Sequence, residues 1–149
     1  MSNHAEIEIL LVEDNPHDAE LTVRTLRKRH HTNRIAHVKD GQAALDWLFG
    51  TDGTGGSGAG RRLKVVLLDL KLPKVDGLEV LRAIRAEPRT ALLPVVIMSS
   101  SNEDRDVTES YTLGANSYVV KPMDFDDFAA AVADLGQYWL RCNREPAKN

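Results

Sequence analysis

The sequence contains a single cysteine, Cys142, so the chain cannot form an internal disulfide. No apolar run approaches the ~18–20 residues that a membrane-spanning helix needs. The first residues also lack the basic and then apolar pattern of a secretory signal sequence. The net charge of -3 gives no general attraction to nucleic acid or to anionic membranes. We therefore expect a soluble cytoplasmic protein that contacts neither nucleic acid nor a membrane.

One low-complexity stretch is present, GTDGTGGSGAG at residues 50–60. Glycine at this density does not sustain a helix or a strand, so we expect a mobile surface loop. A phosphate-binding loop is disfavoured, because that motif follows a strand and ends in a lysine and a hydroxyl residue. Here the glycines follow a predicted helix and the ending is absent.

The rest of the chain, in a total of 149 residues, alternates short apolar runs with helical stretches. The predicted strands are 7–12, 34–38, 65–68, 94–98 and 117–120. The predicted helices run from 16 to about 29, from 40 through 49, over 77–86 and 103–113, and from 125 to about 139. This alternation is typical of a parallel sheet covered by helices on both faces. We expect a doubly wound α/β fold that forms one domain over residues 1–149.

Particular residues mark the limits and the buried faces of these helices. Asn15 followed by Pro16 is a standard helix opening, and Asp40 can cap the second helix. The first helix is expected to bury Ala19, Val23 and Leu26. The last helix carries a repeating apolar stripe made of Phe125, Phe128, Val132, Leu135 and Trp139.

Four of the predicted strands end in residues that can carry chemistry. Asp69 directly follows an apolar run, where an unpaired charge cannot stay inside the sheet. In an open parallel sheet, binding sites form beyond the carboxyl ends of the strands. We therefore expect one crevice that collects Glu13, Asp14, Asp69, Ser99 and Lys121.

Three carboxylates in one crevice repel one another unless a cation compensates their charge. Mg²⁺ suits such a site, because it takes oxygen ligands and keeps positions for water and phosphate oxygens. Asp14 and Asp69 are expected to bind the ion directly, and Glu13 directly or through water. The main-chain carbonyl of Lys71 is a further candidate ligand.

A carboxylate beside Mg²⁺ and a lysine suits attack on a phosphoryl group, a reaction that depends on positioning and charge neutralisation. Asp69 is the candidate nucleophile, Lys121 pairs with one phosphoryl oxygen, and Ser99 reaches another after swinging inward. Each residue also has an ordinary structural explanation. Asp69 could cap a helix or form a turn, Lys121 could be a surface lysine, and Ser99 could be one member of a serine run. Their coincidence at separate strand ends favours the chemical interpretation.

The chain resembles the receiver domain of two-component response regulators over nearly its whole length. The motifs that carry the resemblance are LLVEDN, LLDLKLPKVDG, PVVIMSSS and GANSYVVKP. The resemblance implies a flavodoxin-like sheet with strand order 2-1-3-4-5. It also implies that Asp69 receives phosphate from a phosphohistidine on a partner histidine kinase, with Mg²⁺ required.

The same resemblance assigns roles to the other residues of the crevice. Glu13 and Asp14 become the acidic pair, Ser99 the switch hydroxyl and Lys121 the phosphate-pairing lysine. Tyr118 falls at the position of a rotating aromatic residue that follows Ser99 inward. The Lys121–Pro122 bond is often cis in the family, which would help to aim the lysine inward.

A receiver without an output domain is expected to act through a partner protein. The ending GQYWLRCNREPA, the stretch EDNPHDAELT and the long loop before the third strand resemble single-domain regulators that accompany phytochrome-type kinases. Trp139 and Leu140 either extend the last apolar stripe into a homodimer contact through the last helix and strand, or cover the sheet edge. Both interpretations stay open at this point.

Two other functions are compatible with parts of the pattern. A Mg²⁺-dependent phosphohydrolase with an aspartyl-phosphate intermediate usually needs a second aspartate two positions after the nucleophile. Lys71 occupies that position here, so we expect a phosphoacceptor protein and not an enzyme. A degenerate receiver used only for docking is disfavoured by the complete set of Asp14, Asp69, Ser99 and Lys121.

Overall fold

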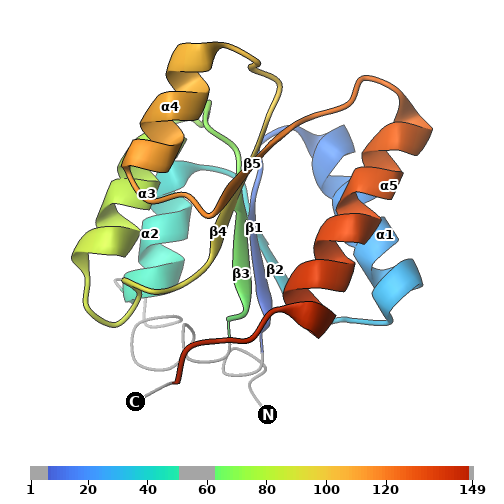
Figure 1. The fold of residues 1–149 in the computed structure, drawn as a ribbon, viewed down its shortest axis with the longest axis horizontal. Coiled ribbons are helices and arrows are strands. Elements are labelled where there is room, and N and C mark those ends of the chain that lie inside the picture. Colours follow the sequence, from blue (N-terminus) through green and yellow to red (C-terminus); the bar gives the residue numbers. More distant parts are fainter. Residues whose placement is uncertain (1–6, 51–62, 148–149) are drawn as a thin grey trace.

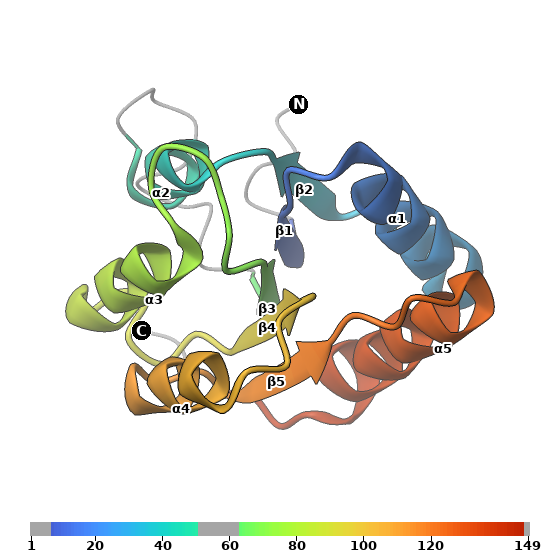
Figure 2. The ribbon, with the colours of Figure 1, turned by 90° about the horizontal axis from the view of Figure 1, so that it is seen from above.

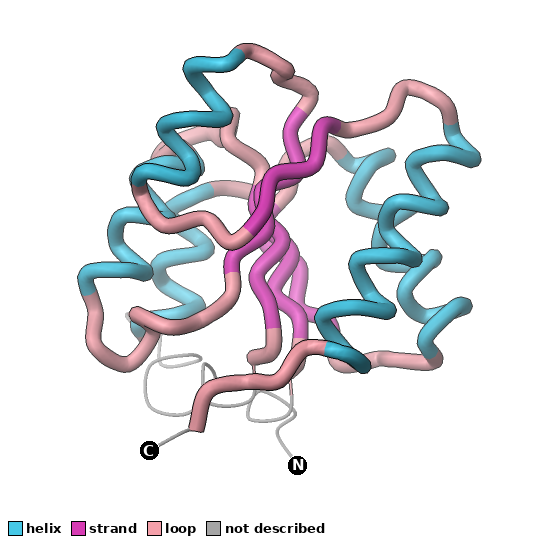
Figure 3. The backbone as a smooth tube through the Cα atoms, viewed as in Figure 1, coloured by secondary structure: helices cyan, strands magenta, loops and turns pink. Residues whose placement is uncertain are grey.

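The five strands form one parallel sheet in the order β2-β1-β3-β4-β5, which is the order that the resemblance to receiver domains implied. The computed structural model describes residues 7–50 and 63–147. The strands are β1 (Ile9–Val12), β2 (Ile35–Val38), β3 (Val65–Leu68), β4 (Val95–Ser99) and β5 (Ser117–Val120). Figure 3 shows them side by side in the centre of the molecule, with helices on either side.

The helices cover both faces of this sheet (Figure 1). Their bounds are α1 (Pro16–His30), α2 (Gly41–Phe49), α3 (Gly77–Ala86), α4 (Asp104–Thr112) and α5 (Phe125–Gly136). α2, α3 and α4 lie on one face, and α1 and α5 lie together on the other (Figure 2). The fold is therefore the flavodoxin-like, doubly wound α/β arrangement expected from the sequence.

Alternation along the strands divides the core into two layers. Successive side chains point to opposite faces of a sheet. Accordingly, Leu10 and Val12 pack in the core beneath α2 and α3, whereas Ile9 and Leu11 pack in the core beneath α1 and α5. β3 and β4 are buried along their whole length, as expected for central parallel strands.

The predicted helix openings form as expected. The side chain of Asn15 accepts hydrogen bonds from the main-chain N–H groups of His17 and Asp18, at 2.9 and 3.0 Å. Asp40 accepts from the N–H of Ala43 at 2.7 Å. These carboxylate and amide caps satisfy main-chain donors that have no partner within the helix.

The packing of α1 against α5 is unusually close at one point. A Cβ atom added at Gly136 would lie 2.4 Å from Cδ2 of His30. The buried His30 ring also places Nε2 2.8 Å from the carbonyl oxygen of Ala133. Glycine at 136 thus lets the two helices lock together near the end of α5.

Three details differ from the sequence-based expectations. Phe125 is 60% exposed, because it stands at the first position of α5, where the stripe has not yet reached the sheet. Val23 is only half-buried. The Lys121–Pro122 bond is trans, since the described residues contain no cis peptide bond. Apart from Gly50, which ends α2, the predicted glycine-rich loop lies outside the described residues.

The last helix also ends differently from the prediction. α5 stops at Gly136 and continues as a π-helical segment, η3 (Gln137–Cys142). Trp139 and Leu140 pack against the core layer beneath α1 and α5. Of the two open interpretations of these side chains, covering the sheet is therefore the one the packing favours.

The described ranges, residues 7–50 and 63–147, contain no helix that qualifies as a candidate membrane span.

Candidate functional site

The register of the sheet brings the predicted strand-end residues to one edge. Val12 lies opposite Leu68, and the N–H of Asp69 donates to the carbonyl of Val12 at 3.1 Å. On the other side, the N–H of Lys121 donates to the carbonyl of Ser99 at 2.8 Å. Main-chain hydrogen bonds between neighbouring strands thus place these strand-end residues along the same edge of the sheet.

Glu13, Asp14 and Asp69 converge at this edge. Each offers a carboxylate oxygen, and the three oxygens lie within 4.8 Å of one another. Glu13 and Asp69 are largely buried, at 4% and 9% exposure, whereas Asp14 is open to solvent. An all-oxygen set with one open side fits a hard divalent cation that keeps water molecules, as Mg²⁺ and Mn²⁺ do.

Lys121 reaches into the same cluster with a trans bond to Pro122. Its ammonium nitrogen lies 2.7 Å from Oε1 of Glu13 and 3.0 Å from Oδ2 of Asp69. The Lys121 side chain is only 6% exposed, so these contacts form largely away from water. The inward aim of the lysine therefore does not depend on the cis bond that the resemblance suggested.

A third carboxylate holds Lys121, and the sequence analysis did not identify it. Oδ2 of Asp18, in the first turn of α1, lies 2.9 Å from the Lys121 ammonium nitrogen. The signal was present in the sequence, because Asp18 lies in the first turn of a helix whose cap, Asn15, directly follows Asp14. A residue in that turn stays close to the end of β1, which here places Asp18 at the crevice.

Burial and crowding shift the pKa values of two groups in the cluster. Burial raises the pKa of Glu13 to about 7, against the lowering effect of its hydrogen bond from Lys121, and repulsion by Asp69 adds to the rise. Burial alone would lower the pKa of Lys121, but hydrogen bonds to Glu13 and Asp18 and attraction to Asp69 raise it overall. The site thus holds more negative charge than its single ammonium compensates.

The turn after β3 fixes the Asp69 side chain and main chain. Oδ1 of Asp69 accepts a hydrogen bond from the N–H of Leu70 at 2.7 Å. The N–H of Gly77 donates to the carbonyl of Leu70 at 2.7 Å, which folds the start of α3 back over this turn. A Cβ atom at Gly77 would lie 2.2 Å from the carbonyl oxygen of Asp69, so only glycine fits there. Lys71 is exposed in this turn, and its predicted role as a carbonyl ligand stays a prediction.

The loop after β4 connects Ser99 with Tyr118. The buried Ser99 hydroxyl oxygen accepts from the N–H of Ser101 at 3.1 Å. The Tyr118 hydroxyl donates to the carbonyl of Ser101 at 2.9 Å, and the Ser101 hydroxyl donates to Asp106 of α4. Tyr118 is therefore already bonded to the loop that Ser99 begins. This chain of contacts runs from the crevice edge to α4.

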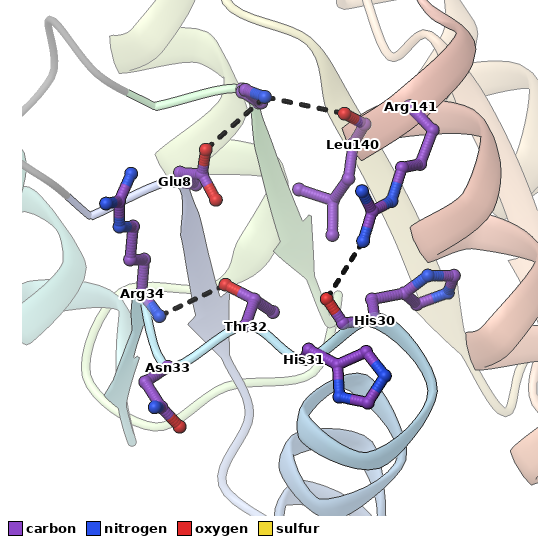
Figure 4. A pocket seen from close by; sticks show the side chains of 9 residues that line it. Glu8, His30, His31, Thr32, Asn33, Arg34, Leu140 and Arg141 are labelled. Carbon is purple, nitrogen blue, oxygen red and sulfur yellow. Dashed lines mark hydrogen bonds and ion pairs between the residues drawn. The ribbon is translucent and has the colours of Figure 1, made fainter.

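A second hollow, of about 330 Å³, lies at the opposite end of the sheet (Figure 4). Lys64 pairs there with Glu8 at 3.3 Å, and the guanidinium of Arg141 donates to the carbonyl of His30 at 3.0 Å. Lys64 also approaches the carbonyl of Leu140, at 3.4 Å. These contacts fasten η3 to α1 and to the start of β3. The acidic cluster lies at the other end of the sheet.

The fold and the strand-end cluster define a parallel α/β protein with an acidic crevice at the carboxyl edge of its sheet. Residues 9–133 match the family of response regulator receiver domains. The chain belongs to this family, whose members are signalling proteins of two-component systems.

Relatives extend over nearly the whole chain. The probable methanogenesis regulatory protein FilR2 of Methanothrix harundinacea is 44% identical over 139 residues, which cover 93% of this chain and 86% of that protein. The response regulator Rcp1 of Synechocystis sp. is 34% identical over 139 residues, covering 93% of this chain and 92% of Rcp1.

Solved structures agree with this assignment. The Mn²⁺-bound form of Rcp1 is similar with a TM-score of 0.83 at 33% identity, over 95% of this chain and 99% of that one. The phosphorylated cyanobacterial phytochrome response regulator RcpA is similar with a TM-score of 0.85 at 31% identity, also over 95% and 99%. In this chain, the acidic cluster of Glu13, Asp14 and Asp69 is a group of side chains that could hold a metal ion.

Proposed function

We propose that this chain is a response regulator that accepts a phosphoryl group on Asp69 from a partner histidine kinase, with Mg²⁺ bound nearby. The observation that carries the proposal is the convergence of Glu13, Asp14 and Asp69 with Lys121 at one edge of the sheet. Mg²⁺ would be held by Asp14 and Asp69, by Glu13 directly or through water, and by the Lys71 carbonyl. Its chemistry there would be neutralisation of phosphoryl charge.

The proposed transfer uses side chains that the fold already gathers at this edge of the sheet. A carboxylate oxygen of Asp69 forms a bond to phosphorus, and the phosphorus–nitrogen bond of the phosphohistidine breaks. The electron pair of that bond returns to the imidazole. Lys121 then pairs with one phosphoryl oxygen, and the Ser99 hydroxyl donates to another. The product is an acyl phosphate on Asp69, with no net hydrolysis.

The proposed switch follows from the contacts of the loop after β4. To reach the phosphoryl group, the Ser99 hydroxyl gives up its bond with the Ser101 N–H, which shifts the loop. Tyr118 and Asp106 are both bonded to Ser101, so the shift reaches β5 and α4 together. Phosphorylation thereby biases the face formed by α4, β5 and α5 between two arrangements.

The proposal is tested by phosphorylation with acetyl phosphate and Mg²⁺, followed by mass spectrometry of the intact protein and its peptides. We expect one added phosphoryl group on Asp69, and none in Asp69→Asn. Asp134→Asn, an exposed aspartate of α5, is the matched control and should be modified like the wild type. Wild-type protein that stays unmodified with both reagents present contradicts the proposal.

The phosphohydrolase alternative gains no support from the site. Lys71, where such an enzyme would place its acid, is an exposed cation. We therefore propose a phosphoacceptor protein that assists only its own phosphorylation and dephosphorylation. Sustained turnover of small phosphate esters would favour the hydrolase instead.

Partners and organisation are part of the same proposal. The similarity to RcpA, a phytochrome response regulator, supports a phytochrome-type histidine kinase as the phosphate donor. We propose a single receiver domain over residues 1–149 that acts in the cytoplasm through proteins and not through nucleic acid. A homodimer through α5 and β5 is supported by the exposed apolar side chains of Val120 and Phe125.

A further inference from the structure

The ammonium group of Lys121 has used all of its hydrogen-bonding capacity. A lysine ammonium has three donors and no acceptor. The nitrogen lies 2.7 Å from Glu13, 2.9 Å from Asp18 and 3.0 Å from Asp69. Each donor is therefore committed to a different carboxylate. A phosphoryl oxygen can gain this ammonium only if one of the three carboxylates gives it up.

The three partners differ in what it costs to release the ammonium. The Glu13 side chain is 5% exposed, so without Lys121 its buried charge would keep only the hydrogen bond from the N–H of Asn15. Asp69 keeps its charge until its oxygen has bonded to phosphorus, so it cannot release the ammonium to an incoming phosphoryl group. The Asp18 side chain is 28% exposed and lies in the first turn of α1. Water and the helix dipole can stabilise Asp18 after it loses the ammonium.

We propose that Asp18 is a positioning residue, which holds the Lys121 ammonium on the α1 side of the crevice and releases it when a phosphoryl group arrives. The inference rests on the proposed function. Asp18 competes with the phosphoryl group for Lys121, and it also takes one of the three ammonium donors, which Glu13 and Asp69 would otherwise share. Those two carboxylates are therefore less occupied by the lysine and more available to a divalent cation.

Loss of the Asp18 charge has opposite effects on two kinds of ligand. Without Asp18, the ammonium falls back on Glu13 and Asp69, and cation binding to the unphosphorylated protein weakens. A phosphoryl group then meets no competitor for Lys121, and its binding strengthens. An ordinary surface ion pair would change neither affinity appreciably.

The experiment compares wild type with Asp18→Asn by titration calorimetry. Mg²⁺ is titrated first, and beryllofluoride, a non-covalent mimic of the phosphoryl group, is then titrated in saturating Mg²⁺. We expect Asp18→Asn to bind Mg²⁺ roughly tenfold more weakly and beryllofluoride about fivefold more tightly. Asp18→Glu keeps the charge and should restore both affinities toward wild type.

Glu20→Gln is the matched control for charge, because Glu20 is an exposed carboxylate of the same helix that pairs with Arg24. It should leave both affinities unchanged. The inference is overturned if Asp18→Asn matches wild type, or if both affinities move in the same direction. Wild-type protein that binds neither ligand overturns the proposed function and this inference together.

Discussion

The burial of the Glu13 carboxyl group determines the pH range in which this side chain carries a negative charge. Its pKa is raised to about 7 because burial disfavours its charged form. A divalent cation needs the carboxylate form, so binding must displace a proton below pH 7. Metal binding at this crevice is thus expected to depend on pH through Glu13, which the sequence marked as a candidate ligand, directly or through water.

We predict that the apparent Mg²⁺ affinity falls by about tenfold for each pH unit below 7 and levels off above it, since one proton competes with one ion. The sign follows from the raised pKa, which keeps Glu13 protonated at pH 6 and ionised at pH 8. Calorimetric titrations from pH 6 to 8 measure the effect. Glu13→Gln should bind more weakly overall and show a flatter profile; an unchanged slope in that variant would refute the link.

Gly77 offers a second test at a single position. A methyl group there would clash with the carbonyl oxygen of Asp69, so the turn must open. We predict that Gly77→Ala lowers the free energy of unfolding by about 1–3 kcal/mol, which is typical of overpacking. Urea denaturation measures this loss. Glu79→Ala, at an exposed position of the same helix, should stay within about 0.5 kcal/mol of wild type.

Among the elements, the strands and the helix openings were predictable because their causes are local. Asn15, Asp40 and Asp76 each cap the helix that follows, and apolar runs form the buried strands. The π-helical turn after α5 was not predictable, since it depends on contacts of Leu140 and Arg141 with distant segments. Asp18 was missed for a related reason: its partner is 103 residues away in the chain.

Arg85 connects three elements around one guanidinium. It donates to the carbonyl of Gly114 at 2.7 and 3.0 Å, to the carbonyl of Leu93 at 2.7 Å and to Oδ1 of Asn116 at 2.9 Å. The end of α3, the segment before β4 and the turn after α4 are thereby tied together. Burial lowers the pKa of this arginine, because the cation loses contact with water.

We predict that Arg85→Ala lowers the free energy of unfolding by about 2–3 kcal/mol, because charge-assisted hydrogen bonds are lost and carbonyl groups stay unpaired. Arg85→Lys should recover only part of the loss, since a single ammonium cannot replace the planar fork. Thermal and urea unfolding measure both. Arg82→Ala, an exposed arginine of the same helix, is the control; an equal loss there would argue against a specific role for Arg85.

The molecule as a whole has two unlike ends. The carboxyl end of the sheet gathers Glu13, Asp69 and Lys121, with an exposed loop leading to α4. At the amino end, η3 is fastened to α1 and β3, and Gly136 lets α1 and α5 interlock. Motion that accompanies a signal is therefore expected at the first end, while the second acts as a fixed base.

Self-association is predicted to use the face of α4, β5 and α5. These elements and the turn between β5 and α5 carry four exposed apolar side chains, in contrast to the packed Trp139: Tyr111, Val120, Met123 and Phe125. We expect light scattering to show a dimer that Phe125→Asp converts to a monomer, because a buried carboxylate would oppose association. Leu92→Asp, at an exposed apolar position outside that face, should keep the wild-type mass. A wild-type monomer both with and without phosphorylation would exclude the dimer.

The fixed base also carries the chain's only thiol. Cys142 is exposed in η3, next to the residues that fasten this segment to the amino end of the sheet. A maleimide dye would consequently attach at one known place, remote from the acidic crevice, without any engineered cysteine. The native sequence thus provides its own handle for fluorescence or surface tethering while the opposite end stays free to react.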